Sequence, residues 1–220
     1  GVVGAVAQFH VRRVLGFHIV SQIGYIVVGL GLVGAGGAEV RRLALAAAVF
    51  YIAHHILVKT NLFLVAGVIR RFGGTEELGP LGGLTTAAPW LAALFLIPAA
   101  SLAGIPPLSG FWAKLGVIRA AVAAEAWIVL AAALGAGLLT LLSMVKIWNE
   151  AFWKDPPEPL PSPDRRGLVL MVAPIALLAA LTVAIGLYPQ ALLGVADRAA
   201  VELLDVDAYR AAAGLLAAPP

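Results

Sequence analysis

The sequence predicts an all-α, polytopic membrane protein. Hydrophobic residues make up 61% of the 220 residues and charged residues only 12%, and the mean hydropathy is +0.97. A soluble domain carries about 25% charged residues, so this chain has too little polar surface to cover a soluble core. The apolar runs are rich in Ala and Leu and lack the period-two alternation of barrel strands. We therefore expect a membrane helix bundle of about five transmembrane helices, one of them discontinuous.

Five apolar stretches are long enough to cross a bilayer, which takes about 20 helical residues. They cover residues 17–36, 43–69, 88–123, 126–148 and 168–188. Residues 1–8 resemble the end of an earlier span, and because the chain starts without Met we expect it to be cut from a longer polypeptide. We assign residues 1–189 to one transmembrane domain. Residues 190–220 form an amphipathic C-terminal tail, in which charged residues alternate with Leu and Val.

The connections between the spans carry unequal numbers of basic residues on the two sides of the predicted membrane. One side collects Arg12, Arg13, Arg70, Arg71, Lys154, Arg165 and Arg166. The other side collects Arg41, Arg42, Arg198 and Arg210. The positive-inside rule places the first side in the cytoplasm. The net charge of +3 reflects these span ends, so it indicates no nucleic-acid partner.

The second span, residues 43–69, carries cationic and titratable side chains at its centre. Tyr51, His55 and Lys59 follow one another at four-residue intervals and so share a helix face, with His54 one step round. A cation near the bilayer centre costs roughly 3 kcal/mol on insertion scales, and such residues commonly mark proton or ion pathways. The stripe therefore predicts a polar face that carries protons inside the bundle.

The histidine pair has two other interpretations. Either His54 or His55 alone could serve only to hydrogen-bond neighbouring helices. A zinc site is disfavoured because adjacent residues point about 100° apart on a helix and no carboxylate lies nearby in the sequence. The chain also has no cysteine, so it contains no disulfide and no Cys-based metal or iron–sulfur site. We expect no metal and no cofactor.

The third span, residues 88–123, contains residues that interrupt a helix. These are Gly104, Pro106, Pro107, Ser109 and Gly110. Two prolines remove backbone donors and clash with the preceding turn, and discontinuous membrane helices are found where backbone lines a cavity. Lys114 follows one turn into the second half. The alternatives are two short spans or a surface loop, but segments of about 17 and 13 residues are short for two complete spans.

The first and fourth spans carry weaker signals. His18, Ser21, Gln22 and Tyr25 share one helix face of the first span, which is typical of a hydrated stripe or of ordinary interhelical hydrogen bonding. Lys146, close to Trp148, resembles an interfacial anchor, although a relay role stays open. None of the five stretches contains Asp or Glu inside the membrane. We therefore expect any carboxylate partner of the buried cations to come from a missing segment or another subunit.

Three segments resemble a family of antiporter-like membrane subunits. They are residues 12–25 (RRVLGFHIVSQIGY), 54–64 (HHILVKTNLFL) and 101–114 (SLAGIPPLSGFWAK). That family includes the Mrp-type multisubunit sodium/proton antiporters and the three large proton-pumping subunits of respiratory complex I. Residues 54–64, together with residues 144–153 (MVKIWNEAFW), are most similar to the D-type subunit of the Mrp antiporters.

The resemblance implies a fold of two inverted repeats, each with one broken helix, of which this chain would hold the last five spans. It implies that Lys114 is the terminal proton-exchange residue and Lys59 an internal relay, with His54 or His55 beside the water chain. The first repeat of the family, with its membrane Glu–Lys pair, is absent from these 220 residues, so the chain is not expected to act alone.

We interpret the chain as the C-terminal half of a proton-conducting subunit of a sodium/proton antiporter. It would lie in a bacterial or archaeal inner (plasma) membrane. Its partners would be lipid, protons, other subunits and a monovalent cation, which the resemblance implies to be Na⁺. One alternative is a proton-pumping subunit of complex I, and another is a membrane scaffold that transports nothing. We find no nucleotide-binding loop, nucleophile setting or cofactor ligand set, so we expect a transporter subunit rather than an enzyme.

Overall fold

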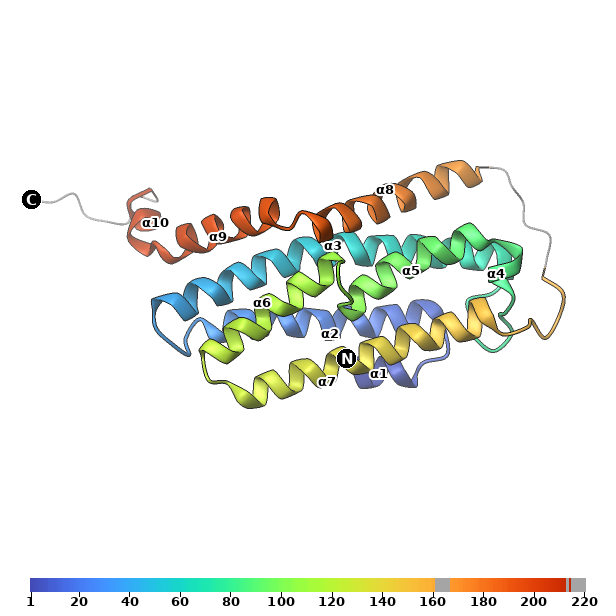
Figure 1. The fold of residues 1–220 in the computed structure, drawn as a ribbon, viewed down its shortest axis with the longest axis horizontal. Helices are drawn as coiled ribbons and strands as arrows, with labels where there is room; N and C mark the ends of the chain where they lie inside the picture. The colour runs from blue at the N-terminus through green and yellow to red at the C-terminus, as the bar shows by residue number, and fades with distance from the viewer. Residues whose placement is uncertain (161–166, 213, 215–220) are drawn as a thin grey trace, which may run out of the picture.

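The computed structural model describes residues 1–160, 167–212 and 214, and Figure 1 shows their arrangement. The elements are α1 (Val2–Ala7), α2 (Val11–Leu32), α3 (Ala38–Gly73), α4 (Leu84–Ala87), α5 (Pro89–Ala103), α6 (Ser109–Ala123), α7 (Trp127–Ile147), the π-helical segment η1 (Trp148–Trp153), α8 (Leu168–Leu187), α9 (Gln190–Leu204) and α10 (Val206–Ala212). The described residues contain no strand beyond an isolated bridge between His10 and Glu77. The all-α prediction is confirmed.

Four helical segments are long and apolar enough to cross a membrane: α2, α3, α7 with η1, and α8. The predicted third span, residues 88–123, is divided into α5 and α6, which confirms its discontinuity. The first span lies at Val11–Leu32 rather than 17–36. It begins after His10, whose backbone is extended, and the glycines at 34, 36 and 37 favour its early end.

The second span is longer than predicted. α3 has 36 residues, although the apolar run alone suggested 43–69. Its ends extend past that run because their charges suit a helix: Glu39 lies in the first turn, and Arg70 and Arg71 lie in the last. Gly74 then ends the helix in the left-handed conformation, with φ of 72°.

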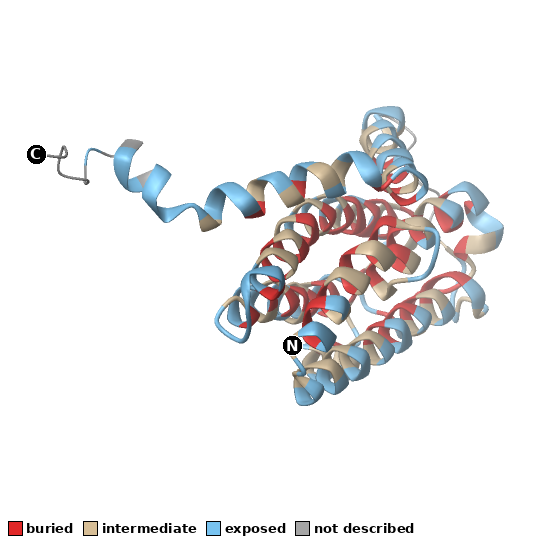
Figure 2. Ribbon diagram, turned by 60° about the vertical axis from the view of Figure 1, so that its left-hand side comes forward, coloured by how far each residue is buried: buried red, intermediate tan, exposed pale blue. Residues whose placement is uncertain are grey.

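α3 is the central element of the bundle. It packs against α2, α5, α6, α8 and α9, and the buried residues in Figure 2 lie mainly on the faces that the helices turn toward one another. At one end of the bundle, aromatic rings fix α5 against η1. The ring centroids of Phe95 and Phe152 lie 4.9 Å apart, and those of Trp148 and Phe152 lie 5.3 Å apart. The outward faces keep many large apolar side chains exposed, as a lipid environment allows.

At the end of α3 that carries Arg70, a buried carboxylate pairs with two arginines that are more exposed. Arg12 Nη1 lies 2.8 Å from Oε1 of Glu76 and Arg70 Nη1 lies 3.8 Å from the same oxygen. The side chain of Glu76 is only 5% exposed. These arginines belong to the basic group predicted for the cytoplasmic side. Two further members of that group, Arg165 and Arg166, lie outside the described residues.

The opposite end of α3 contacts the C-terminal tail. α9 buries Ala196 and Ala200 and packs along α3. Arg42, which the sequence assigned to the other side of the membrane, donates a 2.8 Å hydrogen bond to Asp197 of α9. α9 thus contacts α3 through small buried residues and an ion pair, while Val195, Val201 and Leu203 are exposed, and the amphipathic tail stays a prediction. The division into two domains at residue 189 stays a prediction, because α9 follows α8 after only Tyr188 and Pro189.

Candidate functional site

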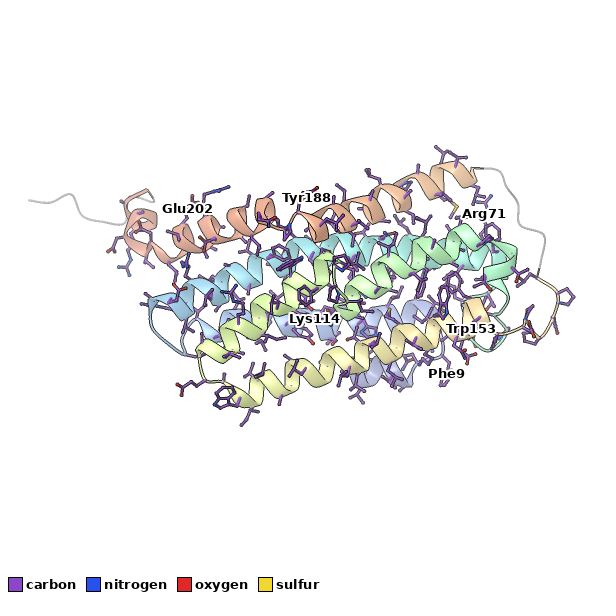
Figure 3. All side chains as sticks on the ribbon, viewed as in Figure 1. Phe9, Arg71, Lys114, Trp153, Tyr188 and Glu202 are labelled. Atoms are coloured by element: carbon purple, nitrogen blue, oxygen red, sulfur yellow. The ribbon has the colours of Figure 1, made fainter. Side chains whose placement is uncertain are left out.

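The break between α5 and α6 places a lysine amine on a helix carbonyl. α5 ends at Ala103, Gly104 follows with φ of 94°, and Pro106 and Pro107 occupy the connecting loop. Lys114 Nζ, one turn into α6, donates a 2.7 Å hydrogen bond to the Ala103 carbonyl. The last carbonyls of a helix have no partner within it and carry partial negative charge. The broken helix thus provides an uncharged acceptor for a cation, and Figure 3 shows Lys114 near the middle of the bundle.

Hydroxyl groups join the two half-helices to α3. Ser101 Oγ of α5 accepts the backbone N–H of Gly110 at 3.1 Å and lies 3.1 Å from Ser109 Oγ. Ser109 Oγ in turn lies 2.9 Å from Nδ1 of His54 on α3. A Cβ at Gly110 would overlap the Ser101 carbonyl oxygen and would lie 2.9 Å from Cε1 of His54. Only glycine therefore permits this close approach of the two half-helices.

The side chains of Tyr51 and Tyr25 link α3 to α2 and to Lys114 of α6. Tyr51 of α3 donates a hydrogen bond from its hydroxyl to Oε1 of Gln22 on α2. The Tyr51 ring lies edge-on to His54, with centroids 5.7 Å apart, and stacks on Tyr25 at 5.2 Å. Lys114 Nζ lies 5.4 Å from the Tyr25 ring centroid. These groups make one contiguous set inside the bundle.

Lys59 lies on the same helix as His54, toward the Arg70 end of α3. Its amine donates a 2.7 Å hydrogen bond to the backbone carbonyl of Leu15 on α2 and lies 5.6 Å from the Phe63 ring centroid. The residue is only 5% exposed. Lys59 therefore resembles Lys114 in its setting, since each buried amine is held by a main-chain carbonyl and neither has a carboxylate partner among the described ion pairs.

Several fully buried polar groups near these lysines have no hydrogen-bond partner within the described chain. They include both ring nitrogens of His18, Nε2 of Gln22, Nε2 of His54 and both amide atoms of Asn61. Leaving a buried polar group unpaired costs about 1–3 kcal/mol, so such atoms normally bind internal water. The part of the bundle between Lys59 and Lys114 is therefore suited to hydration.

The structure differs from the predicted stripe on α3. His54, rather than His55, lies in the interior with Tyr51, and His55 is half-buried. His55 lines an open depression of about 570 Å³ together with Lys59 and Arg12. The reason is that α6 packs on the face of α3 that holds positions 51 and 54, and a helix turns about 100° per residue. Lys59 therefore borders this depression as well as the interior.

A cavity of about 520 Å³ lies between the broken helix and α7, with Lys114 and Tyr25 in its lining. Gly137 of α7 faces both, since a Cβ there would lie 3.6 Å from the Lys114 amine and from the Tyr25 hydroxyl. The Tyr25 hydroxyl donates to the Ala133 carbonyl of α7. Ser21, one of the four predicted polar residues of the first span, lines a neighbouring cavity of about 290 Å³.

Lys146 lies apart from this set. Its amine donates to the backbone carbonyls of Val6, at 2.6 Å, and Gln8, and it lies 4.7 Å from the Phe9 ring centroid. These carbonyls belong to the end of α1 and the residue after it. These contacts hold α1 against α7. The two roles considered from the sequence, an interfacial anchor and a relay, both stay predictions.

Some residues of the site were not singled out from the sequence. Ser101 joins the two half-helices, and its only sequence signal is its place in the segment 101–114. Trp112 of α6 donates from Nε1 to the Gly186 carbonyl of α8 at 2.8 Å, a pairing that no local pattern predicts. Within the described ranges no three His, Cys, Asp or Glu side chains lie close enough to hold a metal ion. The groups brought together are amines, imidazoles, hydroxyls, an amide and carbonyls.

Residues 1–140 match the family described as NADH:quinone oxidoreductase/Mrp antiporter, TM. The chain belongs to this family. The D-type subunit of the Na⁺/H⁺ antiporter of Alkalihalophilus pseudofirmus is 45% identical over 209 residues, which are 95% of this chain and 41% of that protein. The N-type subunit of the NADH-quinone oxidoreductase of Xanthomonas euvesicatoria is 37% identical over 182 residues, covering 80% of this chain and 35% of that protein.

The fold also matches a solved structure, the Mrp complex from a Dietzia species. The TM-score is 0.84, with 37% sequence identity over 94% of this chain and 45% of the matching one. The chain thus spans less than half the length of these relatives. The predicted resemblance and the antiporter-like membrane fold are both confirmed. Activity, ions and partners belong to whole proteins of the family, so for this chain they are proposals.

Proposed function

We propose that this chain is a proton-conducting part of a monovalent-cation/proton antiporter subunit. The observation that carries the proposal is the pair of buried amines, Lys59 and Lys114, each held by a main-chain carbonyl. Near them lie buried imidazoles, amides and hydroxyls, and several of the imidazole and amide atoms have no hydrogen-bond partner within the described chain. Ionisable residues at membrane depth commonly mark proton relays.

In this proposal a proton moves between Lys59 and Lys114 in steps. His18 and His54 accept and release it through their ring nitrogens, and Gln22 and Tyr51 orient the water between them. The Leu15 carbonyl accepts a hydrogen bond from Lys59 and the Ala103 carbonyl accepts one from Lys114, so neither ammonium is left without a polar partner. His55 lies at the edge of the path, beside Lys59, where a proton can enter from a neighbouring segment.

The identity of the exchanged cation is inferred from the name of a similar protein. The 45% identical protein is named as a subunit of a Na⁺/H⁺ antiporter, so we assign Na⁺ as the cation that moves against the proton. The partners would then be the other subunits of a multisubunit antiporter and the surrounding lipid. The location would be a bacterial or archaeal plasma membrane, and the whole would be a secondary transporter rather than an enzyme.

The second candidate is a proton-pumping subunit of complex I. The 37% identity to the N-type subunit of an NADH-quinone oxidoreductase favours it. We prefer the antiporter because the identity to the antiporter relative is higher and covers 95% rather than 80% of the chain. Genes for the other Mrp subunits next to this one would favour the antiporter, and genes for an NADH-oxidising arm would favour complex I.

The test replaces each amine in the full-length subunit within its assembled complex. Lys59→Ala and Lys114→Ala should each abolish Na⁺-driven proton movement in vesicles while the complex assembles normally. Arg210→Ala is the control, because this arginine pairs only with Asp207 at the surface, 3.6 Å away, among the described ion pairs. Transport unchanged in both lysine variants would leave only the scaffold interpretation.

A further inference from the structure

The C-terminal end of α8 packs against the loop between α5 and α6, which breaks the third predicted span. A Cβ added to Gly186 would overlap the Pro107 carbonyl oxygen and would lie 2.7 Å from Leu108 Cα and 2.9 Å from Leu108 C. All three are backbone atoms, so a change of side-chain rotamer cannot relieve the overlap. Two backbones therefore meet here at a distance that only glycine permits.

A hydrogen bond from α6 also holds Gly186 in place. Trp112 Nε1 of α6 donates to the Gly186 carbonyl at 2.8 Å. α8 ends at Leu187, so Gly186 carries one of the last four carbonyls of the helix, which have no partner within it. The indole satisfies this acceptor and ties α8 to the first turn of α6.

The loop between these contacts also positions the proton-exchange groups. Pro107 and Leu108 connect the Ala103 carbonyl, which binds Lys114, to Ser109, which binds His54. We propose that Gly186 and Trp112, here called the α8 clamp, are positioning residues that hold this loop in register with Lys114 and His54. The inference rests on the proposed function, since it concerns the geometry of the same two groups.

The contact between α8 and the loop is made by backbone atoms, which favours a positioning role. The residues that follow Gly186 face outward: Leu187 is 54% exposed and Tyr188 is 75% exposed. The preceding residue, Ile185, packs against the apolar cluster that contains Ala113 and Val117 of α6, so α8 meets the loop itself through the Gly186 backbone. Displacement of the loop by about 1 Å would separate donor from acceptor at Lys114, and misplacements of that size can cost about 100-fold in rate.

The experiment compares matched variants of the full-length subunit in the assembled complex in vesicles. Gly186→Ala should lower Na⁺-driven proton flux by about tenfold or more. Trp112→Phe keeps the aromatic ring and removes the donor, and should lower the flux by about threefold to tenfold. The controls are Gly135→Ala, whose Cβ would meet nothing within 4 Å, and Trp127→Phe, at a residue 60% exposed; both should transport as wild type.

The shape of the pH profile separates positioning from loss of protein. A displaced loop changes the partner of the Lys114 amine, so both clamp variants should shift the pH dependence of transport beyond the spread of the two controls. A variant that only reduces the amount of complex lowers the profile without shifting it. If Gly186→Ala fails to assemble, Trp112→Phe decides the matter alone.

Two results would overturn the inference, and they differ from failure of the proposed function. Transport by Trp112→Phe with wild-type rate and pH profile would overturn it, as would a lowered but unshifted profile in every clamp variant that assembles. If Lys114→Ala transports normally, the proposed function itself fails, whatever the clamp variants do. If Lys114→Ala is inactive while the clamp variants transport as wild type, the inference about the α8 clamp is refuted and the proposed function stands.

Discussion

Single residues in this bundle act through contacts that tolerate no larger or differently oriented side chain. Gly110 is the clearest case, because the Ser101 carbonyl oxygen occupies the space that a Cβ would need. His54 is another, since its Nδ1 bonds to Ser109 while its neighbour His55 faces an open depression. Two adjacent histidines thus have different surroundings, and their substitutions should have different effects.

Gly110→Ala should disrupt the junction of α5 and α6. Overpacking of this kind costs about 1–3 kcal/mol in a packed interior, and here the obstacle is backbone. We expect a lower thermal midpoint of the purified full-length subunit in detergent and loss of proton transport. Gly24→Ala is the control, because its Cβ would meet nothing within 4 Å. Equal midpoints for the two variants would contradict the described junction.

The two histidines can be compared directly. His54→Phe removes the partner of Ser109 from a fully buried position, whereas His55→Phe changes a half-buried residue at the edge of the path. Na⁺-driven proton flux in vesicles should fall further in His54→Phe. A larger loss in His55→Phe would place the main path along the outer side of α3 and refute the path through His54.

At the scale of elements, the break between α5 and α6 could be predicted because Gly104, Pro106 and Pro107 cannot continue a helix. The choice between His54 and His55 could not, because it depends on which face of α3 receives α6. The pairing of Trp112 with Gly186 was equally out of reach, since the two lie 74 positions apart in the chain. Composition therefore predicts roughly where the apolar spans lie, whereas packing between distant segments determines which side chains form the site.

The contact between α1 and α7 gives a prediction at this scale. Lys146→Met keeps the length of the side chain and removes the donor to the carbonyls of Val6 and Gln8. Carbonyls left unpaired in a partly buried site cost about 1–3 kcal/mol. We expect a lower thermal midpoint with Na⁺-driven proton flux retained, because Lys146 shares no described hydrogen bond with the set around Lys114. Loss of flux at a wild-type thermal midpoint would restore a relay role for Lys146.

Different ion pairs stabilise the two ends of the bundle. At the Arg70 end the Glu76 side chain is 5% exposed and faces Arg12 and Arg70. At the other end Asp197, 47% exposed, pairs with Arg42, 39% exposed. Arg12 and Arg70 are 43% and 64% exposed, so only the carboxylate of this group is buried. A hydrogen bond to a buried charged group contributes more than an exposed ion pair, so the two ends should still differ in their sensitivity to substitution.

Glu76→Gln should therefore destabilise the protein by about 1.5–3 kcal/mol, because it removes a buried carboxylate that binds Arg12. Asp197→Asn should cost no more than about 1 kcal/mol. Thermal unfolding of the full-length protein in detergent measures both, and added salt should diminish the smaller effect further. The account of the two ends would be wrong if Asp197→Asn were the more damaging change.

The central claim for the whole molecule is that the amine of Lys114 gains and loses a proton at membrane depth. Lys114→Arg tests it most directly, because arginine keeps the positive charge but does not release its proton. The measurement is Na⁺-driven proton flux in vesicles that contain the complete complex at wild-type abundance. We predict that Lys114→Arg abolishes the flux as fully as Lys114→Ala does. Flux at the wild-type rate with arginine at this position would contradict the claim, because a fixed charge would then suffice.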